Sequence, residues 1–493
     1  VQYSTAYSYS RNGSRPRETS AMQNRRRSPV GPLPPPSPPP SPPPAPPTSL
    51  PSSSTPAPPL REDVSSPTLR LLRLRLRRAW GALTSRHDGA PRHLGDDWAA
   101  FDAAFDEAYV HVDGFAFGCT VVALGRTHGV VHQQTYGGEA SDTIYAVHSM
   151  TKIVTTIACL QLRDRGLLTL DDPIAMHLPS FREARTLDDR RSTAPSSTIS
   201  IRHCLNHTSG LSYYWTDPAH VTSATEKAAG AWALYEDLRS GMDNAAVVDS
   251  FWSRAPALFE AGSHYNYAGG HCIVAAIVQR LSGQDFTAYL RENILQPLGM
   301  PDTTYTLSPE QARRLTPRCP LELAALPLPW WHWPFLPIFT FPGDVHVEAH
   351  QARGDAGLKG TARDWSRLAL MLLRNGELDG VRVLSAASVA EMTTSSVGGA
   401  LIEPPFGFQG GVDDSAYEGP PVAPAFRAPE EDQHVCRGFN YFPGHSVGLG
   451  LLTVEEAERA TLDPAAQGTA WWCGFGSTYI GVNRTSGVGV LLL

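Results

Sequence analysis

Short runs rich in β-branched residues stand near both ends of the more apolar part of the chain. Residues 119–124 and 129–132 form one pair of runs, and residues 479–482 and 488–492 form another. Runs of this kind separated by a short glycine-containing turn are typical of β-hairpins. The stretch 97–112 instead repeats its large apolar residues every three or four positions, which predicts a helix. We therefore predict a helix that leads into a hairpin, and a second hairpin that can share the same antiparallel sheet.

The middle of the chain has a helical period. Residues 147–163, 272–281 and 362–373 each carry apolar residues at helical spacing, and no self-similar period indicates a repeat protein. Strands at both ends with helices between them favour an α+β sandwich, in which an antiparallel sheet is flanked by helices and carries an inserted, mostly helical domain. Active sites tend to lie in crevices between such units.

The first part of the chain has a different composition. Residues 32–59 are almost entirely Pro, Ser, Ala and Thr, which offers few large side chains to bury. Residues 1–95 contain fourteen Arg, no Lys and four acidic residues, although the whole chain has a net charge of −7. We predict a disordered Arg- and Pro-rich region over 1–95. Such a start resembles a plastid or mitochondrial transit peptide, while nucleic-acid binding and plain disorder compete with that interpretation.

Several classes of protein are not favoured. No apolar run approaches the roughly 18 residues that cross a bilayer, and no secretory signal peptide opens the chain. The seven cysteines are scattered and never form a CxxC pair, so neither a disulfide framework nor a zinc site is indicated. No HExxH motif is present. We expect no metal, no cofactor and no nucleic-acid partner, and the sequence does not indicate an oligomeric state.

The tetrapeptide Ser149-Met150-Thr151-Lys152 is the first candidate for catalysis. It precedes an amphipathic helical run, so the serine and the lysine three positions later share one helix face. A serine hydroxyl becomes a good nucleophile only when a neighbouring base takes its proton, and a lysine can be that base if its pKa is lowered. The tetrapeptide alone is also common by chance, with Ser149 as a helix cap and Lys152 as a solvated side chain.

The surrounding segments resemble a known superfamily. Residues 144–152 are similar to the nucleophile segment of the serine β-lactamases and penicillin-binding proteins, closest to class C β-lactamases and family VIII carboxylesterases. Residues 199–211 are close to the signature I-T-I-R-x-L-L-x-H-T-S-G-L, and residues 357–361 and 372–380 also match. The resemblance implies that residues 96–493 form a β-lactamase-related serine hydrolase domain.

The second catalytic element of this superfamily is Y-x-N. The spacing to the Leu281-Ser282-Gly283 segment selects Tyr267 as the family tyrosine, which places Gly269 at the asparagine position. A tyrosinate near a lysine can take the proton from the serine or return it to the leaving group. Tyr265 is a weaker rival for this role. Family VIII esterases often lack the asparagine, so the resemblance favours an esterase over a lactamase.

The third element is K-T-G in lactamases, on a strand beside the nucleophile. Here Trp472-Cys473-Gly474-Phe475 stands in its place and resembles the W-x-G of family VIII. The cationic residue that would pair with a β-lactam carboxylate is missing, which again favours esters. The resemblance implies that Trp472 and Gly474 contribute to substrate binding, and that the N–H groups of Ser149 and Phe475 form the oxyanion hole.

Two further features have weaker interpretations. His207 in the H-T-S-G signature fits a structural histidine better than a triad member, and no G-x-S-x-G elbow supports another hydrolase class. The aromatic segment 330–341 fits either a lid or acyl-binding wall, or ordinary core packing.

The leading functional hypothesis is a serine hydrolase that forms a covalent acyl-enzyme, most simply a carboxylesterase acting on small acyl esters. A β-lactamase or D-amino-acid peptidase, which would cleave an amide, and a catalytically silent binding protein of the same fold are the alternatives.

Overall fold

The computed structural model of the chain describes residues 95–106, 111–112, 115–116, 118–187, 193–195, 198–211, 244–250, 252–254, 257, 259–316, 352–402, 442–460, 462–474 and 478–493. Nearly all of the Arg- and Pro-rich region 1–95, and the whole aromatic segment 330–341, lie outside these residues. The predictions made for those two segments therefore stay predictions.

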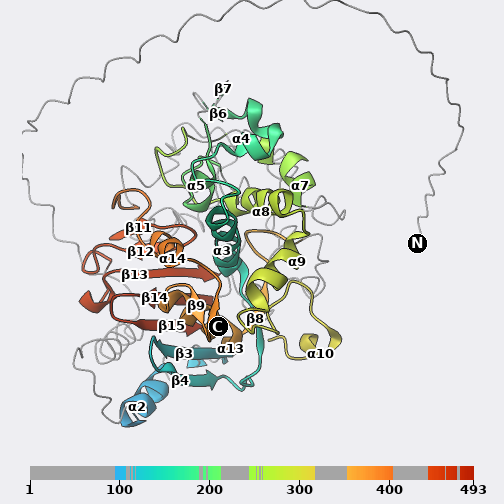
Figure 1. The fold of residues 1–493 in the computed structure, drawn as a ribbon. Helices are drawn as coiled ribbons and strands as arrows, with labels where there is room; N and C mark the ends of the chain where they lie inside the picture. Colours follow the sequence, from blue (N-terminus) through green and yellow to red (C-terminus); the bar gives the residue numbers. More distant parts are fainter. Residues whose placement is uncertain are drawn as a thin grey trace, which may run out of the picture. The chain divides into compact units, whose positions relative to one another are not determined.

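A seven-stranded antiparallel sheet holds the two hairpins together (Figure 1). The strand order is β11-β12-β13-β14-β15-β3-β4, and Val490 of β15 stands opposite Ala123 of β3. The prediction that both hairpins share one sheet is thus confirmed. The strands are β3 (Cys119–Gly125), β4 (Gly129–Tyr136), β11 (His445–Val447), β12 (Leu452–Val454), β13 (Thr469–Gly474), β14 (Thr478–Asn483) and β15 (Val488–Leu492).

Helices cover both faces of the sheet. Val122 of β3 belongs to the main apolar core, and α13 (Ala362–Leu373) packs against β3, β14 and β15. Val121 points to the other face, where it joins a small cluster with Phe105 of α2 (Gly95–Phe105). Successive side chains of a strand face opposite ways, so β3 must be apolar on both sides. The predicted α+β arrangement of a sheet flanked by helices is confirmed.

The first predicted helix is shorter than its pattern indicated. We expected it to reach residue 112, but α2 ends at Phe105, and β1 (His111–Val112) pairs with β2 (Phe115–Ala116). The dipeptide Asp113-Gly114 between the two strands is a sequence that favours a two-residue hairpin. This turn preference and the β-branched Val112 favour a hairpin, and they outweigh the apolar spacing that predicted a longer helix.

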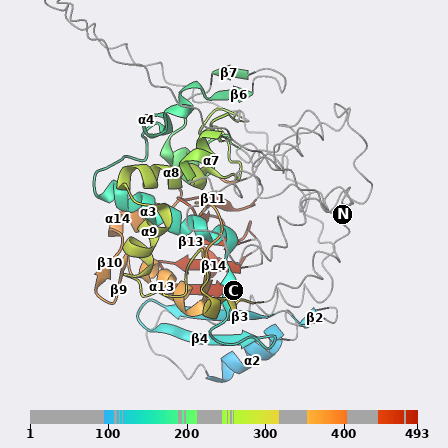
Figure 2. The same ribbon diagram turned by 90° about the vertical axis from the view of Figure 1, so that its right-hand side faces the viewer.

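Between β5 (Ile144–Ala146) and β8 (Lys359–Thr361), most of the regular elements in the described residues are helices, as predicted. Helix α8 contacts α3, α4, α5, α7 and α9, and Figures 1 and 2 show α3 close to both α8 and the sheet. The remaining helices are α3 (Thr151–Asp164), α4 (Ile174–His177), α5 (Ile201–Leu205), α7 (Asn244–Ser250), α8 (Gly270–Ser282), α9 (Phe286–Leu290), α10 (Pro309–Ala312) and α14 (Ala386–Met392).

Short elements connect these helices. Single turns of 3-10 or π type are η2 (His148–Met150), η3 (Pro179–Glu183), η5 (Trp252–Arg254), η6 (Arg291–Leu295) and η13 (Pro464–Ala466). The short strands pair antiparallel as β5 (Ile144–Ala146) with β8 (Lys359–Thr361), β6 (Arg185–Leu187) with β7 (Thr193–Pro195), and β9 (Glu377–Leu378) with β10 (Val381–Arg382). The pair β5–β8 is the one that leads directly to Ser149.

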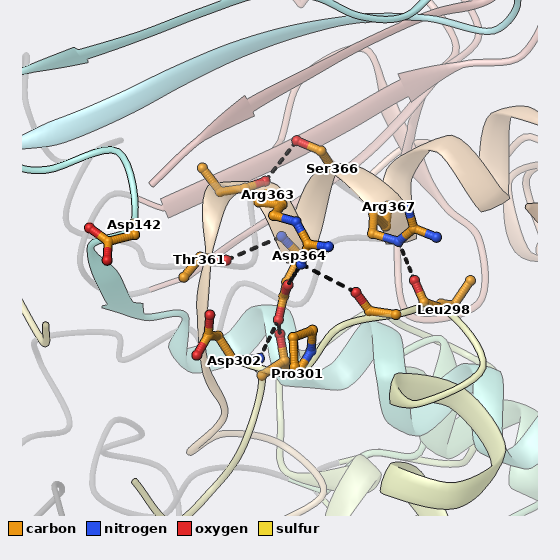
Figure 3. Close-up of polar contacts among 12 residues, drawn as sticks. Asp142, Leu298, Pro301, Asp302, Thr361, Arg363, Asp364, Ser366 and Arg367 are labelled. Carbon is orange, nitrogen blue, oxygen red and sulfur yellow. Dashed lines mark hydrogen bonds and ion pairs between the residues drawn. The ribbon is translucent and has the colours of Figure 1, made fainter. Parts of the chain in front are cut away.

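A buried carboxylate anchors the end of β8 (Figure 3). Asp364 is fully buried in the first turn of α13, and its backbone N–H donates to Thr361 Oγ1 at 3.2 Å. Its carboxylate accepts from the N–H of Asp302 at 2.8 Å and from Thr303 Oγ1 at 3.0 Å. Burial raises the pKa of this carboxyl above its usual value. The bonds tie α13 and β8 to the loop before α10.

Replacing Asp364 with Ala is expected to lower the free energy of unfolding by roughly 2–4 kcal/mol, because buried donors lose their acceptor. Chemical denaturation measures this change. Glu377→Ala removes an ion pair with Arg382 whose two side chains are about half exposed, and it should cost no more than about 0.5 kcal/mol. Equal losses in the two variants would contradict the anchoring role of Asp364.

Candidate active site

Ser149 lies in the turn η2, between β5 and α3. The preceding residue, His148, has φ +45°, in the left-handed region that non-glycine residues rarely adopt. The N–H of Val147 donates to the carbonyl of Leu358 at 3.1 Å, and the N–H of Leu358 donates to Thr151 Oγ1 at 3.1 Å. The turn is therefore bent sharply just before the serine and tied on both sides to the segment that enters β8.

Three side chains predicted from the sequence meet at this turn. Ser149 Oγ lies 2.7 Å from the hydroxyl of Tyr267, and Lys152 Nζ lies 2.8 Å from the same hydroxyl. The distance from Lys152 Nζ to Ser149 Oγ is 3.4 Å. The helical spacing of three residues does place the serine and lysine on one face, as expected. The tyrosine comes from the loop before α8, more than a hundred residues further along the chain.

Lys152 is fully buried and its amine is held from several directions. Besides Ser149 and Tyr267, Nζ donates to the backbone carbonyl of Asp355 at 2.9 Å. It also lies 4.8 Å from the centroid of the Tyr267 ring, a distance at which a cation is attracted by the ring face. The amine is thus fixed within reach of the hydroxyl that contacts the serine.

The segment around Asp355 was not singled out from the sequence. Asp355 is 1% exposed, and its carboxylate accepts two hydrogen bonds from the guanidinium of Arg353, at 2.8 and 2.7 Å. The neighbouring carbonyl of Gly354 accepts from Thr155 Oγ1 at 2.6 Å. Backbone carbonyls carry no residue-type signal, so only the match of residues 357–361 to the family motif pointed toward this region.

The rival tyrosine lies elsewhere. Tyr265 is fully buried, and its hydroxyl makes no hydrogen bond among the described residues. Burial raises the pKa of this hydroxyl well above its usual value. The structure therefore brings Tyr267, and not Tyr265, to Ser149.

Gly269, at the position of the family asparagine, has no room for a side chain. A Cβ atom there would overlap the indole ring of Trp252, which is 1% exposed. Glycine is therefore required by close approach of the ring rather than by its backbone angles.

Introducing the family amide as Gly269→Asn is expected to destabilise the fold by about 1–3 kcal/mol through overpacking, and to lower activity rather than raise it. Thermal or chemical denaturation checks the first effect. The matched control is Gly398→Asn, a position with φ +65° and open space, where Asn is tolerated within about 1 kcal/mol. A stable and more active Gly269→Asn protein would contradict this packing argument.

The last strand segment predicted for the site lies against the nucleophile turn. Gly474 at the end of β13 approaches Val147 so closely that a Cβ would overlap the carbonyl oxygen of that residue. Trp472 is 4% exposed, and its ring lies 5.6 Å from the rings of Tyr267 and His207. Phe475 lies outside the described residues, so the expected second oxyanion donor stays a prediction.

Neither a metal site nor a membrane helix is found in the part of the chain that the structure describes. There, no three His, Cys, Asp or Glu side chains are grouped so that they could hold a metal ion. No described helix is long and apolar enough to span a bilayer.

A flanked antiparallel sheet with a serine, a lysine three residues later and a distant tyrosine defines the class of β-lactamase-fold serine hydrolases. The chain belongs to the family described as Beta-lactamase, whose sequence model matches residues 107–493. This family match also confirms the predicted superfamily resemblance.

Two proteins similar to this chain are named as esterases. Esterase EstB of Burkholderia gladioli is 28% identical over 378 residues, covering 72% of this chain and 89% of that protein. Lovastatin esterase of Penicillium rubens is 26% identical over 326 residues, covering 64% of this chain and 71% of its own length. The chain is thus an enzyme of a hydrolase and acyltransferase family that includes esterases.

Solved structures show the same fold. EstCE1, described as a hydrolase with promiscuous acyltransferase activity, superposes with a TM-score of 0.53 at 19% identity, over 86% of this chain and 94% of that one. Simvastatin synthase (LovD) of Aspergillus terreus gives 0.54 at 18% identity, over 87% and 93%.

Proposed function

We propose that the chain is a carboxylesterase that forms a covalent acyl-enzyme on Ser149. The observation that carries this proposal is the contact of Ser149 Oγ with the Tyr267 hydroxyl at 2.7 Å, while that hydroxyl also contacts Lys152 Nζ at 2.8 Å. A phenol oxygen held between a serine hydroxyl and a lysine amine lies on a hydrogen-bonded path along which the serine proton can be transferred. The domain proposed to carry this chemistry is residues 96–493.

The reaction proposed here has two halves. Ser149 Oγ attacks the ester carbonyl carbon while its proton passes to the Tyr267 oxygen, and an oxyanion forms on the substrate. The bond from carbon to the alcohol oxygen then breaks, and Tyr267 returns the proton to the departing alkoxide. Water attacks the acyl-Ser149 ester in the same way, giving the carboxylic acid and free Ser149.

The proposed oxyanion hole consists of the backbone N–H groups of Ser149 and Phe475, with Trp472 and Gly474 beside it. Support comes from the close approach of Gly474 to Val147, which brings the end of β13 against the nucleophile turn. Removing one such donor typically costs about 3 kcal/mol of transition-state stabilisation.

Small uncharged acyl esters are the proposed substrates, ahead of β-lactams and D-amino-acid peptides. Trp472-Cys473-Gly474 places no cation where lactamases carry a lysine, and Gly269 supplies no carboxamide. A carboxylate-bearing β-lactam therefore loses its main partners, whereas a neutral ester loses nothing. The naming of two relatives as esterases supports the same choice.

The substrate class is tested by assaying the full chain with a short-chain p-nitrophenyl ester and with a chromogenic cephalosporin. We expect ester turnover with much weaker cephalosporin turnover, and we expect Ser149→Ala to abolish the ester reaction. Ser282→Ala, at the end of α8, serves as the matched control and should retain activity. Cephalosporin turnover equal to or above ester turnover would favour the lactamase alternative, and no turnover of either substrate would favour the silent binding protein.

A further inference from the structure

His207 is the central residue of a tight connection between α5 and the loop that carries Tyr267. It lies two residues after Leu205, the last residue of α5, is 1% exposed and has φ +59°. Three residues further on, Gly210 has φ +77° and approaches the carbonyl of Phe259 too closely for any side chain. The course of the chain from His207 to Gly210 therefore depends on two positive φ angles and on a position that only glycine can fill.

Both residues that flank Tyr267 donate their backbone N–H to this one histidine. The N–H of Asn266 donates to the backbone carbonyl of His207 at 2.8 Å. The N–H of Ala268 donates to the ring atom Nδ1 of His207 at 3.3 Å. The residue before Tyr267 and the residue after it are thus held by the main chain and the side chain of His207, respectively.

The same ring also packs against the catalytic candidate. The centroids of the His207 and Tyr267 rings are 4.9 Å apart. On another side, the Trp472 ring stacks on His207 at 5.6 Å with an interplanar angle of 12°. The phenol ring therefore has a fixed support, which matters because a displacement of about 1 Å in a reacting group can cost roughly a hundredfold in rate.

We propose that His207 is a positioning residue that fixes the hydroxyl of Tyr267 against Ser149, an inference that rests on the proposed function. It acts through Nδ1, which must keep its lone pair free to accept the Ala268 N–H, so the ring is neutral with its proton on Nε2. Burial lowers the pKa of His207 well below its usual value, in agreement with a neutral ring.

Four variants separate the Nδ1 contact from general packing. His207→Asn keeps an acceptor close to the Nδ1 position and tolerates positive φ, so kcat should stay within about threefold of the original protein. His207→Phe keeps a ring but removes the acceptor, and His207→Gln places its acceptor too far out. Both should lower kcat by roughly tenfold to a hundredfold with little change in KM. The control, His203→Gln, disturbs a histidine whose Nδ1 accepts from the N–H of Ser200 at the start of α5, and it should lower Tm without lowering kcat.

The readouts are ester kinetics and the rate at which a fluorophosphonate labels Ser149, each beside a thermal melt. Labelling should follow kcat across the variants: slow in His207→Phe and His207→Gln, and restored in His207→Asn. Equal losses in Asn and Gln, or a fully active Phe variant, would overturn the positioning role. If the Phe variant does not fold, the comparison of Asn with Gln decides alone.

Failure of the proposed function gives a different result. If the original chain labels at Ser149 but hydrolyses no ester, the substrate class is wrong, and the labelling rates still decide the role of His207. If Ser149 of the original chain is not labelled at all, there is no activated nucleophile for Tyr267 to serve, and both proposals are overturned.

Discussion

Replacing Lys152 with Met is expected to lower kcat/KM for an ester by a factor on the order of 10³–10⁴, the largest loss expected for a change outside Ser149. Methionine keeps most of the volume of the lysine side chain but removes the ammonium, which lies 2.8 Å from the Tyr267 hydroxyl and 3.4 Å from Ser149 Oγ. Without that amine, the Tyr267 hydroxyl loses the neighbour that we propose it needs to take up the serine proton.

The fold should survive this change. Removing the fully buried amine relieves its desolvation cost, but it also takes away the donor that the Asp355 carbonyl accepts from. Because these two effects oppose each other, Tm should change by no more than a few degrees while activity falls.

The matched control is Lys359→Met. Lys359 is 2% exposed, and its Nζ donates to the carbonyls of Tyr305 and Gly357. The activity of the Lys359→Met variant should stay within roughly tenfold of that of the original protein. Similar losses of activity in both variants would show that Lys152 acts only through the packing of this region.

Replacing Tyr267 with Phe is expected to lower kcat by roughly 10²–10⁴ with KM little changed. The ring contacts with His207 and Trp472 can persist in this variant, since only the hydroxyl is lost. The hydroxyl is the group that contacts both Ser149 and Lys152, so its loss removes the path of the proton in both halves of the reaction. Steady-state and single-turnover ester kinetics measure the effect.

Tyr265→Phe is the matched control for this substitution. The Tyr265 hydroxyl is buried and makes no hydrogen bond among the described residues, so its removal should leave kcat within about twofold and should not reduce stability. If Tyr265→Phe were the damaging change and Tyr267→Phe were active, the assignment of the two tyrosines would be reversed.

Much of the fold follows from local patterns in the sequence. The four predicted strands correspond to β3, β4, β14 and β15, and the helices at 272–281 and 362–373 correspond to α8 and α13. These segments are buried and strongly periodic, so the local preference and the tertiary packing agree. The prediction that the first helix reaches residue 112 was wrong. The apolar spacing continues toward Asp113-Gly114, but the chain already forms a hairpin strand before this turn.

The site was predictable only where side chains carry the chemistry. Ser149 and Lys152 are related by helix geometry, so their spacing alone predicts that they meet. The choice between Tyr265 and Tyr267 depended on a family resemblance, because two tyrosines two positions apart give no local reason to prefer one.

The remaining contacts of the site left no pattern in the sequence. Lys152 is held by a backbone carbonyl, that of Asp355. The Nδ1 atom of His207 accepts from a backbone N–H, that of Ala268. Contacts of that kind depend on the fold that brings the segments together, and almost any residue type can supply a carbonyl.

The central claim is that Ser149 carries the acyl group. The most direct test is to quench the full chain in acid during turnover of a short-chain p-nitrophenyl ester and to find the acylated peptide by mass spectrometry. We predict a single acyl adduct on the peptide that contains Ser149. The adduct should be absent from Ser149→Ala, and it should be more abundant in any variant whose deacylation step is slower. Ester hydrolysis that continues in Ser149→Ala, with the acyl group on another residue, would contradict the account.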